Sequence, residues 1–400
     1  MRALVLAAAA AAALPAIAPA QVAVRGETVH TMAGPPIADG VVLIGADGRI
    51  ERVGPAASVA VPAGYRTLTA RVVTPGLIDA RSVVGLAGAL NQPHDQDQLD
   101  RGSAIQPELR AIDAYNATDT LVSWVRSYGV TTLHTGHGPG ALVSGQTMVV
   151  KTRGSNVSQA LVDTTAMVAM TLGRSVGANY RNPGTRARGV AMLRAELEKA
   201  REYDRKRSAG EQQGRDLGME MLARVLRREV PALVTAQQVP EILAALRLKE
   251  EFGFDMVLDG AAEAYRVIPE IRRAGVPVIL HPSMVRLNGE TRNASLETAA
   301  QLREAGIVVA LQSGFEGYVP KTRVVLFEAA IAAANGLGME NALRTITIDA
   351  ARAIGQERRI GSLEAGKDGD VVLFDGDPFE YLSKVCAVVI DGVVVSEGCR

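Results

Sequence analysis

The chain has 400 residues, which is enough for one large core domain and a small appended one. Its composition is globular, with 48% apolar and 22% charged residues. Lys and Arg together number 43, and so do Asp and Glu, so no net charge attracts nucleic acid or an anionic membrane surface. Aromatic residues make up only 4% of the chain, which argues against a surface that stacks nucleic-acid bases.

The first 20 residues have the pattern of a secretion signal. Arg2 supplies one positive charge, residues 4–17 are apolar and mostly alanine, and residues 18–20 form a small-x-small cleavage site before Gln21. The alternative is a membrane anchor, but the apolar stretch is shorter than the roughly 20 residues of a spanning helix. We therefore predict a signal peptide over residues 1–20 and a periplasmic or secreted mature protein without a membrane span.

Short β-rich runs and turn signals alternate in the next part of the chain. Strands are expected at residues 21–24, 40–44, 50–53 and 65–73, and the dipeptide at residues 47–48 predicts a hairpin turn. The residues after 355 have the same character. Two β segments at opposite ends of a chain usually meet, so residues 21–73 and 355–400 predict a small β-sandwich domain.

Between these segments, strands alternate with amphipathic helices. Strands are expected at residues 129–134, 148–151, 231–235, 256–259, 276–280 and 307–312, and helices at residues 189–207, 217–228, 239–252, 263–274, 322–337 and 339–346. This α/β alternation favours a barrel of parallel strands over residues 74–354. A polar insertion at residues 86–120 follows the first strand and should face the C-terminal rim, where such barrels place their sites.

Two cysteines flank the last expected hairpin. Cys386 and Cys399 lie on either side of a run with an Asp-Gly turn at residues 391–392. With a two-residue turn, Cys386 faces Glu397, which places the two cysteines diagonally rather than opposite one another. A disulfide and two free thiols therefore both remain open.

Two motifs resemble those of one known family. Residues 75–83, PGLIDARSV, resemble the "PGLID-x-H-x-H" signature of the amidohydrolase superfamily, and residues 359–370, RIGSLEAGKDGD, resemble its "RIGSLEPGKDADLV" segment. The second motif is similar in particular to the imidazolonepropionase-like branch. The resemblance covers the mature chain and implies a distorted (β/α)8 barrel of the TIM type with an appended β-sandwich. It also implies metal-dependent hydrolysis of C–N bonds in small amides or cyclic amides, with zinc or another divalent cation.

The resemblance also implies where metal ligands should lie: two histidines on strand 1, one each on strands 5 and 6, and an aspartate on strand 8. This chain has other residues there, namely Arg81, Val83, Gln237 (or Thr235), Gly260 and Gly314. None of them offers an imidazole or a carboxylate, and the Arg81 guanidinium would repel a cation. We therefore predict that the chain has no metal cofactor. Arg81 is expected to occupy the vacated space and to pair with Asp79 or Asp259.

Two functions from different classes follow. The first is a pseudoenzyme, either a binding protein for a small molecule or a subunit that pairs with an active homologue, in a homo- or hetero-oligomer. The second is a residual or altered hydrolase that uses a rim set of His134, His137, His281 and Lys151, the last being the lysine that resembles the superfamily's carboxylated bridge. The simpler alternative for these four is structural: hydrogen-bonded histidines in a polar pocket and a lysine in a salt bridge. We expect the first function.

Overall fold

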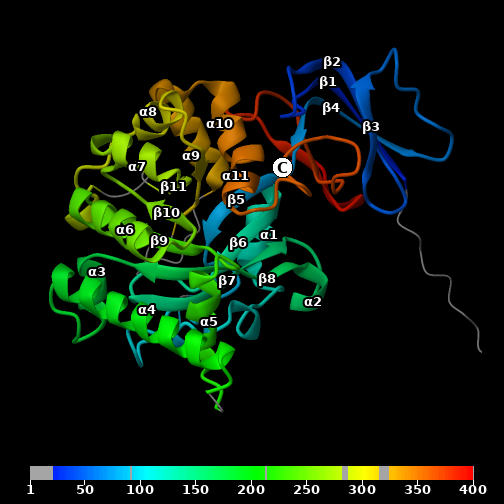
Figure 1. The fold of residues 1–400 in the computed structure, drawn as a ribbon. Coiled ribbons are helices and arrows are strands. Elements are labelled where there is room, and N and C mark those ends of the chain that lie inside the picture. The colour runs from blue at the N-terminus through cyan, green and yellow to red at the C-terminus, as the bar shows by residue number, and fades with distance from the viewer. Residues whose placement is uncertain (1–20, 91, 212–213, 282–286, 315–323, 400) are drawn as a thin grey trace, which may run out of the picture.

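The computed structural model describes residues 21–90, 92–211, 214–281, 287–314 and 324–399. The predicted signal peptide lies outside these residues. Two sheets organise the described chain: a nearly closed barrel of eight strands surrounded by helices, and a separate seven-stranded sheet that lies to one side of it (Figure 1). The predicted fold class is therefore confirmed.

The barrel strands follow one another around the sheet in chain order. They are β5 (Leu77–Ser82), β6 (Val130–Gly136), β7 (Val143–Lys151), β8 (Leu161–Thr171), β9 (Ala232–Ala236), β10 (Met256–Gly260), β11 (Val278–Leu280) and β12 (Val309–Leu311). Contacts between β12 and β5 bring the two edges together. The expectation that all strands are parallel is wrong for β7, which pairs antiparallel with both β6 and β8.

Helices surround the barrel, and most of them follow β8 in the sequence (Figure 1). They are α1 (Thr120–Ser127), α2 (Val157–Ala160), α3 (Arg174–Asn179), α4 (Arg186–Ser208), α5 (Leu217–Leu226), α6 (Val239–Phe252), α7 (Ile268–Ala274), α8 (Thr298–Glu304), α9 (Val325–Ala332), α10 (Met339–Thr345) and α11 (Ile348–Ala353). Over the described part of the chain, no helix combines the length and the apolarity that crossing a membrane requires.

The bounds of α6 follow directly from its sequence. Gln238 and Glu241 form a capping box at its start, with a proline in the first turn that needs no amide partner. Gly253 ends the helix with a φ of 77°, a left-handed conformation that glycine adopts without steric cost. The helix therefore begins directly after β9, and its first residues lie at the rim of the barrel.

The barrel interior contains an apolar layer to which the strands contribute inward-facing side chains. Its members on seven of the eight strands are Ile78, Val149, Met167, Leu233, Val257, Ile279 and Ala310. All of them are at most 5% exposed, so the barrel is a packed core and not a pore. This layer separates a C-terminal mouth from an N-terminal floor.

The second sheet combines strands from two distant parts of the chain. Its order is β15 (Val393–Glu397), β14 (Val385–Ile390), β13 (Val371–Phe374), β4 (Arg66–Pro75), β1 (Val22–Val29), β2 (Ile37–Ile44) and β3 (Ile50–Pro55). The sheet curls strongly, because the backbone at Gly48 after β2 lies against the turn at Asp391 and Gly392 between β14 and β15. One continuous curled sheet thus forms the small domain.

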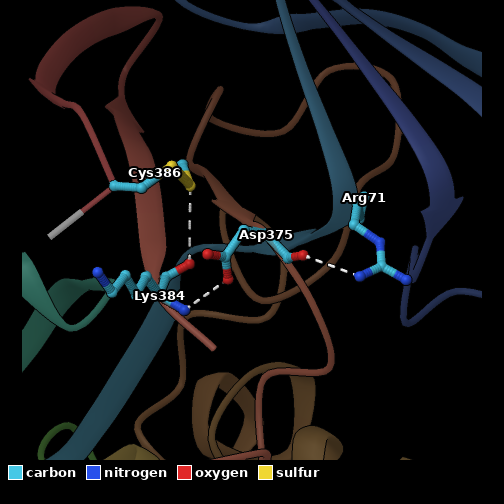
Figure 2. Close-up of a disulfide and its surroundings, with 5 residues drawn as sticks. Arg71, Asp375, Lys384 and Cys386 are labelled. Atoms are coloured by element: carbon cyan, nitrogen blue, oxygen red, sulfur yellow. Dashed lines mark hydrogen bonds between the residues drawn. A yellow bond between two sulfur atoms is a disulfide. The ribbon is translucent and has the colours of Figure 1, made fainter. Parts of the chain in front are cut away.

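Cys386 and Cys399 form a disulfide, with their Cα atoms 3.9 Å apart (Figure 2). The expected register, with Cys386 opposite Glu397, is wrong by one residue. The pairing shifts between Val388 and Val389, so that Ala387 lies opposite Glu397 and the Cys386 carbonyl accepts a hydrogen bond from the amide of Gly398, directly after β15. This irregularity brings the cysteines together. Because β15 has one extra residue at the shift, Cys399 lies one residue nearer to the position opposite Cys386 than in a regular hairpin.

Candidate functional site

Above the apolar layer, the same strand alternation places polar side chains on the inner face at the mouth. Two residues after the inward-facing Leu233, Val257, Ile279 and Ala310 come Thr235, Asp259, His281 and Gln312. Because side chains of a strand point to one face at every second residue, all four project toward the barrel axis. On each of these strands, the inward-facing side chain changes from apolar to polar within two residues. This change marks the mouth as the candidate site.

A cavity of about 160 Å3 lies at this mouth. Its described wall includes the polar layer and, with it, all five positions at which the family resemblance implies metal ligands: Arg81, Val83, Gln237, Gly260 and Gly314. The structure therefore brings together residues that are up to 233 positions apart in the sequence. Ser82, Pro139 and Thr291 complete the described wall.

The two glycines of the wall face side chains that fill the adjacent space. A Cβ atom at position 260 would collide with the amide group of Gln237, and one at position 314 would collide with the His281 ring. Both glycines also have positive φ values, 78° and 72°, which other residues adopt at a steric cost. Replacing either glycine by a metal-binding residue would therefore require Gln237 or His281 to move.

Two buried carboxylates lie at the mouth, and polar neighbours hold both of them. Asp259 accepts hydrogen bonds of 2.5 Å from the Thr235 hydroxyl and the Gln312 amide. Asp79 accepts hydrogen bonds from the backbone amide and the hydroxyl of Ser313. Burial raises the pKa of Asp79 to about 6, although these hydrogen bonds oppose the rise.

The Arg81 guanidinium is buried beside these carboxylates without an ion pair to either. The side chain is 3% exposed and donates hydrogen bonds to the backbone carbonyls of Ser82, at 3.1 Å, and His137. Within the described chain, the Nε atom of Arg81 has no hydrogen-bond partner. Burial lowers the pKa of Arg81, while Asp259 and Asp79 oppose this effect through space. The predicted salt bridge with Asp79 or Asp259 is thus wrong, because Ser313, Thr235 and Gln312 already hold the carboxylates.

His134 lies inside the barrel and not in the cavity wall. Its Nδ1 lies 2.7 Å from the carbonyl of Ala80, and its Nε2 lies 2.6 Å from the hydroxyl of Thr147. Since a carbonyl only accepts, Nδ1 carries the proton and Nε2 accepts from the threonine. Burial and the positive charge of Arg81 lower the pKa of His134 to about 3. Both nitrogens are engaged, which is the structural role that the simpler alternative describes.

The other two histidines differ in position. His137 follows β6 and is 5% exposed, and neither of its ring nitrogens has a hydrogen-bond partner among the described residues. Burial and the charge of Arg81 lower its pKa to about 4. His281 follows β11 and belongs to the cavity wall. Of the three histidines expected at the rim, the structure therefore places only His281 in the cavity.

Lys151 lies at the opposite end of the barrel, which corrects the expectation of a place at the rim. It ends β7, and because this strand is antiparallel, it pairs with Thr132 near the start of β6. Its ammonium group forms ion pairs with Asp368 at 3.2 Å, Asp370 and Asp391 at 3.5 Å. Burial alone would lower the pKa of Lys151, but the three carboxylates together raise it. Lys151 therefore connects the barrel floor to the small domain.

The cavity wall does not suit a divalent metal ion. Its described members with metal-binding side chains are Asp259 and His281, and both oxygens of Asp259 already accept short hydrogen bonds. A zinc site needs three or four nitrogen, sulfur or oxygen ligands, and the positive charge of Arg81 would oppose the cation. Elsewhere in the described chain, Asp375, Cys386 and Cys399 have suitable spacing, but the disulfide engages both sulfurs (Figure 2).

Comparison with known proteins places this arrangement in a family. The family model described as "Amidohydrolase family" matches residues 285–396. An amidohydrolase structure from Thermotoga maritima superposes with a TM-score of 0.88 at 29% identity, over 94% of this chain and all of that one. The chain belongs to the amidohydrolase superfamily.

Within the superfamily, an imidazolonepropionase from Shouchella clausii is 34% identical over 139 residues, 33% of this chain and 30% of the relative. The amidohydrolase tasK of Hapsidospora irregularis is 23% identical over 377 residues, 86% of this chain and 38% of the relative. The chain thus spans about a third of the length of these two curated relatives. An adenosine deaminase from Xanthomonas campestris, solved with bound zinc, shares the fold with a TM-score of 0.59 at 17% identity.

Sequence reasoning missed the partners that hold the two carboxylates. Gln312 and Ser313 directly follow β12 and hydrogen-bond to Asp259 and Asp79, yet neither residue was a candidate. The available signal was the alternation along β12, where Gln312 continues the inward face of Ala310. The pairing of Ser313 with Asp79 depends on closure of the barrel between β12 and β5, which no local pattern predicts.

Proposed function

We propose that this chain is a metal-free member of the amidohydrolase superfamily that binds a small molecule at the barrel mouth without hydrolysing it. The observation that supports this most is the composition of the cavity wall. The wall contains all five positions of the implied metal ligands, and none of them has a metal-binding imidazole or carboxylate: Arg81, Val83, Gln237, Gly260 and Gly314. Without a metal, the family's means of activating water is absent.

The experiment that tests this is the metal content of the purified chain after dialysis against zinc, measured by mass spectrometry. We expect less than about 0.1 equivalents, since a structural or catalytic zinc site binds tightly. A chelator-treated sample of the same protein gives the background. One equivalent of zinc that resists removal by dialysis would overturn the proposal.

A residual hydrolase is the second candidate, and fewer observations support it. Of its four residues, His134 is engaged at both nitrogens, Lys151 is at the barrel floor, and His137 is not part of the cavity wall. Only His281 could act on a molecule in the cavity. Turnover of small amides or cyclic amides that is lost on His281→Gln substitution would favour this candidate over the first.

A partner subunit is a further form of the non-catalytic proposal. The chain has the small domain, the ion pairs of Lys151 and the packed barrel layer although it lacks the implied metal ligands. This supports a scaffold that is retained without the catalytic site. Co-purification of an active homologue from the native host is the expected result, and repeated recovery of this chain alone would count against it. A periplasmic or secreted location is part of the same proposal, because the disulfide suits an oxidising compartment.

A further inference from the structure

The cavity at the barrel mouth is lined by a buried positive charge, Arg81, that forms no ion pair with the described residues. Arg81 is 3% exposed and uses two of its nitrogens on backbone carbonyls, while Nε has no partner within the described chain. A guanidinium has five N–H donors in a planar fork that matches a carboxylate. A buried charge without a counter-ion is costly, so a partner from outside the chain would be favoured here.

The two neighbouring carboxylates do not fill this position. The oxygens of Asp259 accept from Thr235 and Gln312, and those of Asp79 accept from Ser313. Asp79 also accepts a hydrogen bond from the backbone amide of Arg81, at 3.3 Å, and both carboxylates raise the pKa of the Arg81 side chain through space. Among the described residues, the Arg81 guanidinium is therefore bound by backbone carbonyls and not by a carboxylate.

The cavity also supplies a second donor. The Oε1 atom of Gln237 accepts a hydrogen bond from the backbone amide of Ala262, at 3.2 Å, which fixes the orientation of the side-chain amide. Its Nε2 then occupies the space beside Gly260, where both residues line the cavity. The absence of a side chain at position 260 is what admits this NH2 group.

Size and charge limit the ligand. A volume of about 160 Å3 corresponds to roughly five water molecules, so the cavity admits a molecule of a few heavy atoms. Arg81 is the one permanent cation in the described wall, and Asp259 faces the same space. The single positive charge of Arg81 can neutralise a monoanion, whereas a dianion such as phosphate would keep one unpaired negative charge beside Asp259.

On these grounds, and resting on the proposed metal-free function, we propose that the barrel mouth is a binding site for a small carboxylate, held by the Arg81 guanidinium and the Gln237 amide. The site thus uses the position of a metal-ligand histidine to bind an anion. The carboxylate group is the feature that is recognised, and the rest of the ligand extends toward the open end of the barrel.

The test uses the full chain, stripped of metal by chelator, and carbon-13-labelled acetate followed by NMR at constant ionic strength. Acetamide, which has the same shape without the charge, and inorganic phosphate are the comparison ligands. We expect saturable binding of one acetate and at least tenfold weaker binding of acetamide and of phosphate. Equal binding of acetate and acetamide, or no saturable binding of acetate, would overturn the inference.

Variants assign the effect to Arg81. Arg81→Met should weaken acetate binding at least tenfold, whereas Asp259→Asn, which removes the negative charge from the wall, should strengthen it several-fold. Arg126→Met is the matched control, because Arg126 also donates to a backbone carbonyl, that of Thr152, but lies outside the cavity. Acetate binding that is unchanged in Arg81→Met would contradict the assignment. If that variant does not fold, the gain in Asp259→Asn decides.

The outcome is independent of the metal experiment. Stoichiometric zinc would overturn the proposed function whatever acetate does. Failure of acetate to bind a zinc-free chain would overturn only the carboxylate site.

Discussion

The two ends of the barrel each contain a buried cation, and the cations are treated in opposite ways. At the floor, Lys151 is 2% exposed and is surrounded by Asp368, Asp370 and Asp391. At the mouth, Arg81 is 3% exposed and contacts backbone carbonyls, while the nearby carboxylates bind other groups. At the floor, ion pairs within the chain neutralise the lysine and so join two domains, whereas at the mouth the described residues give the arginine no ion pair.

The largest expected effect is at the floor. Lys151→Met leaves Asp370 buried without its cation, whereas Asp368 keeps its ion pair with Arg359, and we expect the free energy of unfolding to fall by about 3–5 kcal/mol. Denaturant unfolding at pH 7 measures it. Arg153→Met is the control, because Arg153 pairs with Asp391 at a more exposed position and should cost less than about 1 kcal/mol. A Lys151→Met variant as stable as the parent would show that this ion cluster does not hold the domains together.

A pH effect of intermediate size is expected at the mouth. The pKa of Asp79 is about 6 when folded and 3.8 is its ordinary value, so the folded chain holds the proton more tightly than the unfolded chain. Asp79 therefore favours folding at pH 4, and this contribution is lost as the pH rises through 6. The loss by pH 7 is on the order of 3 kcal/mol, at about 1.4 kcal/mol per pKa unit.

The measurement is the difference in unfolding free energy between the parent chain and Asp79→Asn, from pH 4 to pH 7. The variant should gain stability relative to the parent as the pH rises, since its amide carries no charge to bury. Taking the difference removes the contributions of other groups, such as His134, whose lowered pKa acts in the opposite direction. A difference that does not vary with pH would contradict the buried, proton-holding state of Asp79.

The smallest expected effect sharpens the contrast between the ends. Arg81→Met removes two hydrogen bonds to carbonyls, but it also removes a buried charge without an ion pair. Because these contributions oppose one another, we expect unfolding free energy to change by no more than about 1 kcal/mol in chloride buffer free of carboxylates. A loss as large as that of Lys151→Met would mean that Arg81 is structural, as Lys151 is.

The family motifs and the strand periodicity were sufficient to predict the fold. Residues 75–79 and 359–370 identified the superfamily. The order of the expected strands then located the five substituted positions, which the structure places in one cavity. Local pattern was enough here, because each position lies at or just past the carboxyl end of its own strand.

Other features depend on contacts that local pattern does not encode. The strand β8 was not expected, and without it the reversal of β7 went unrecognised, so Lys151 was placed at the wrong end of the barrel. The disulfide depends on a one-residue irregularity between β14 and β15 that no turn dipeptide specifies. The carboxylates of Asp259 and Asp79 bind Gln312 and Ser313 instead of forming an ion pair with Arg81. Only closure of the barrel brings Ser313 to Asp79.

The pairing of β4 with β13 has a consequence for the order in which the chain can fold. Pro75 lies opposite Val371, about 300 positions later, so the centre of the small sheet joins two segments that leave the ribosome far apart in time. The strands β1 to β4 must wait, with one edge unpaired, while the whole barrel is synthesised. Until the C-terminal segment is present, one edge of β4 is open to pairing with another strand, and Lys151 lacks the carboxylate of Asp370.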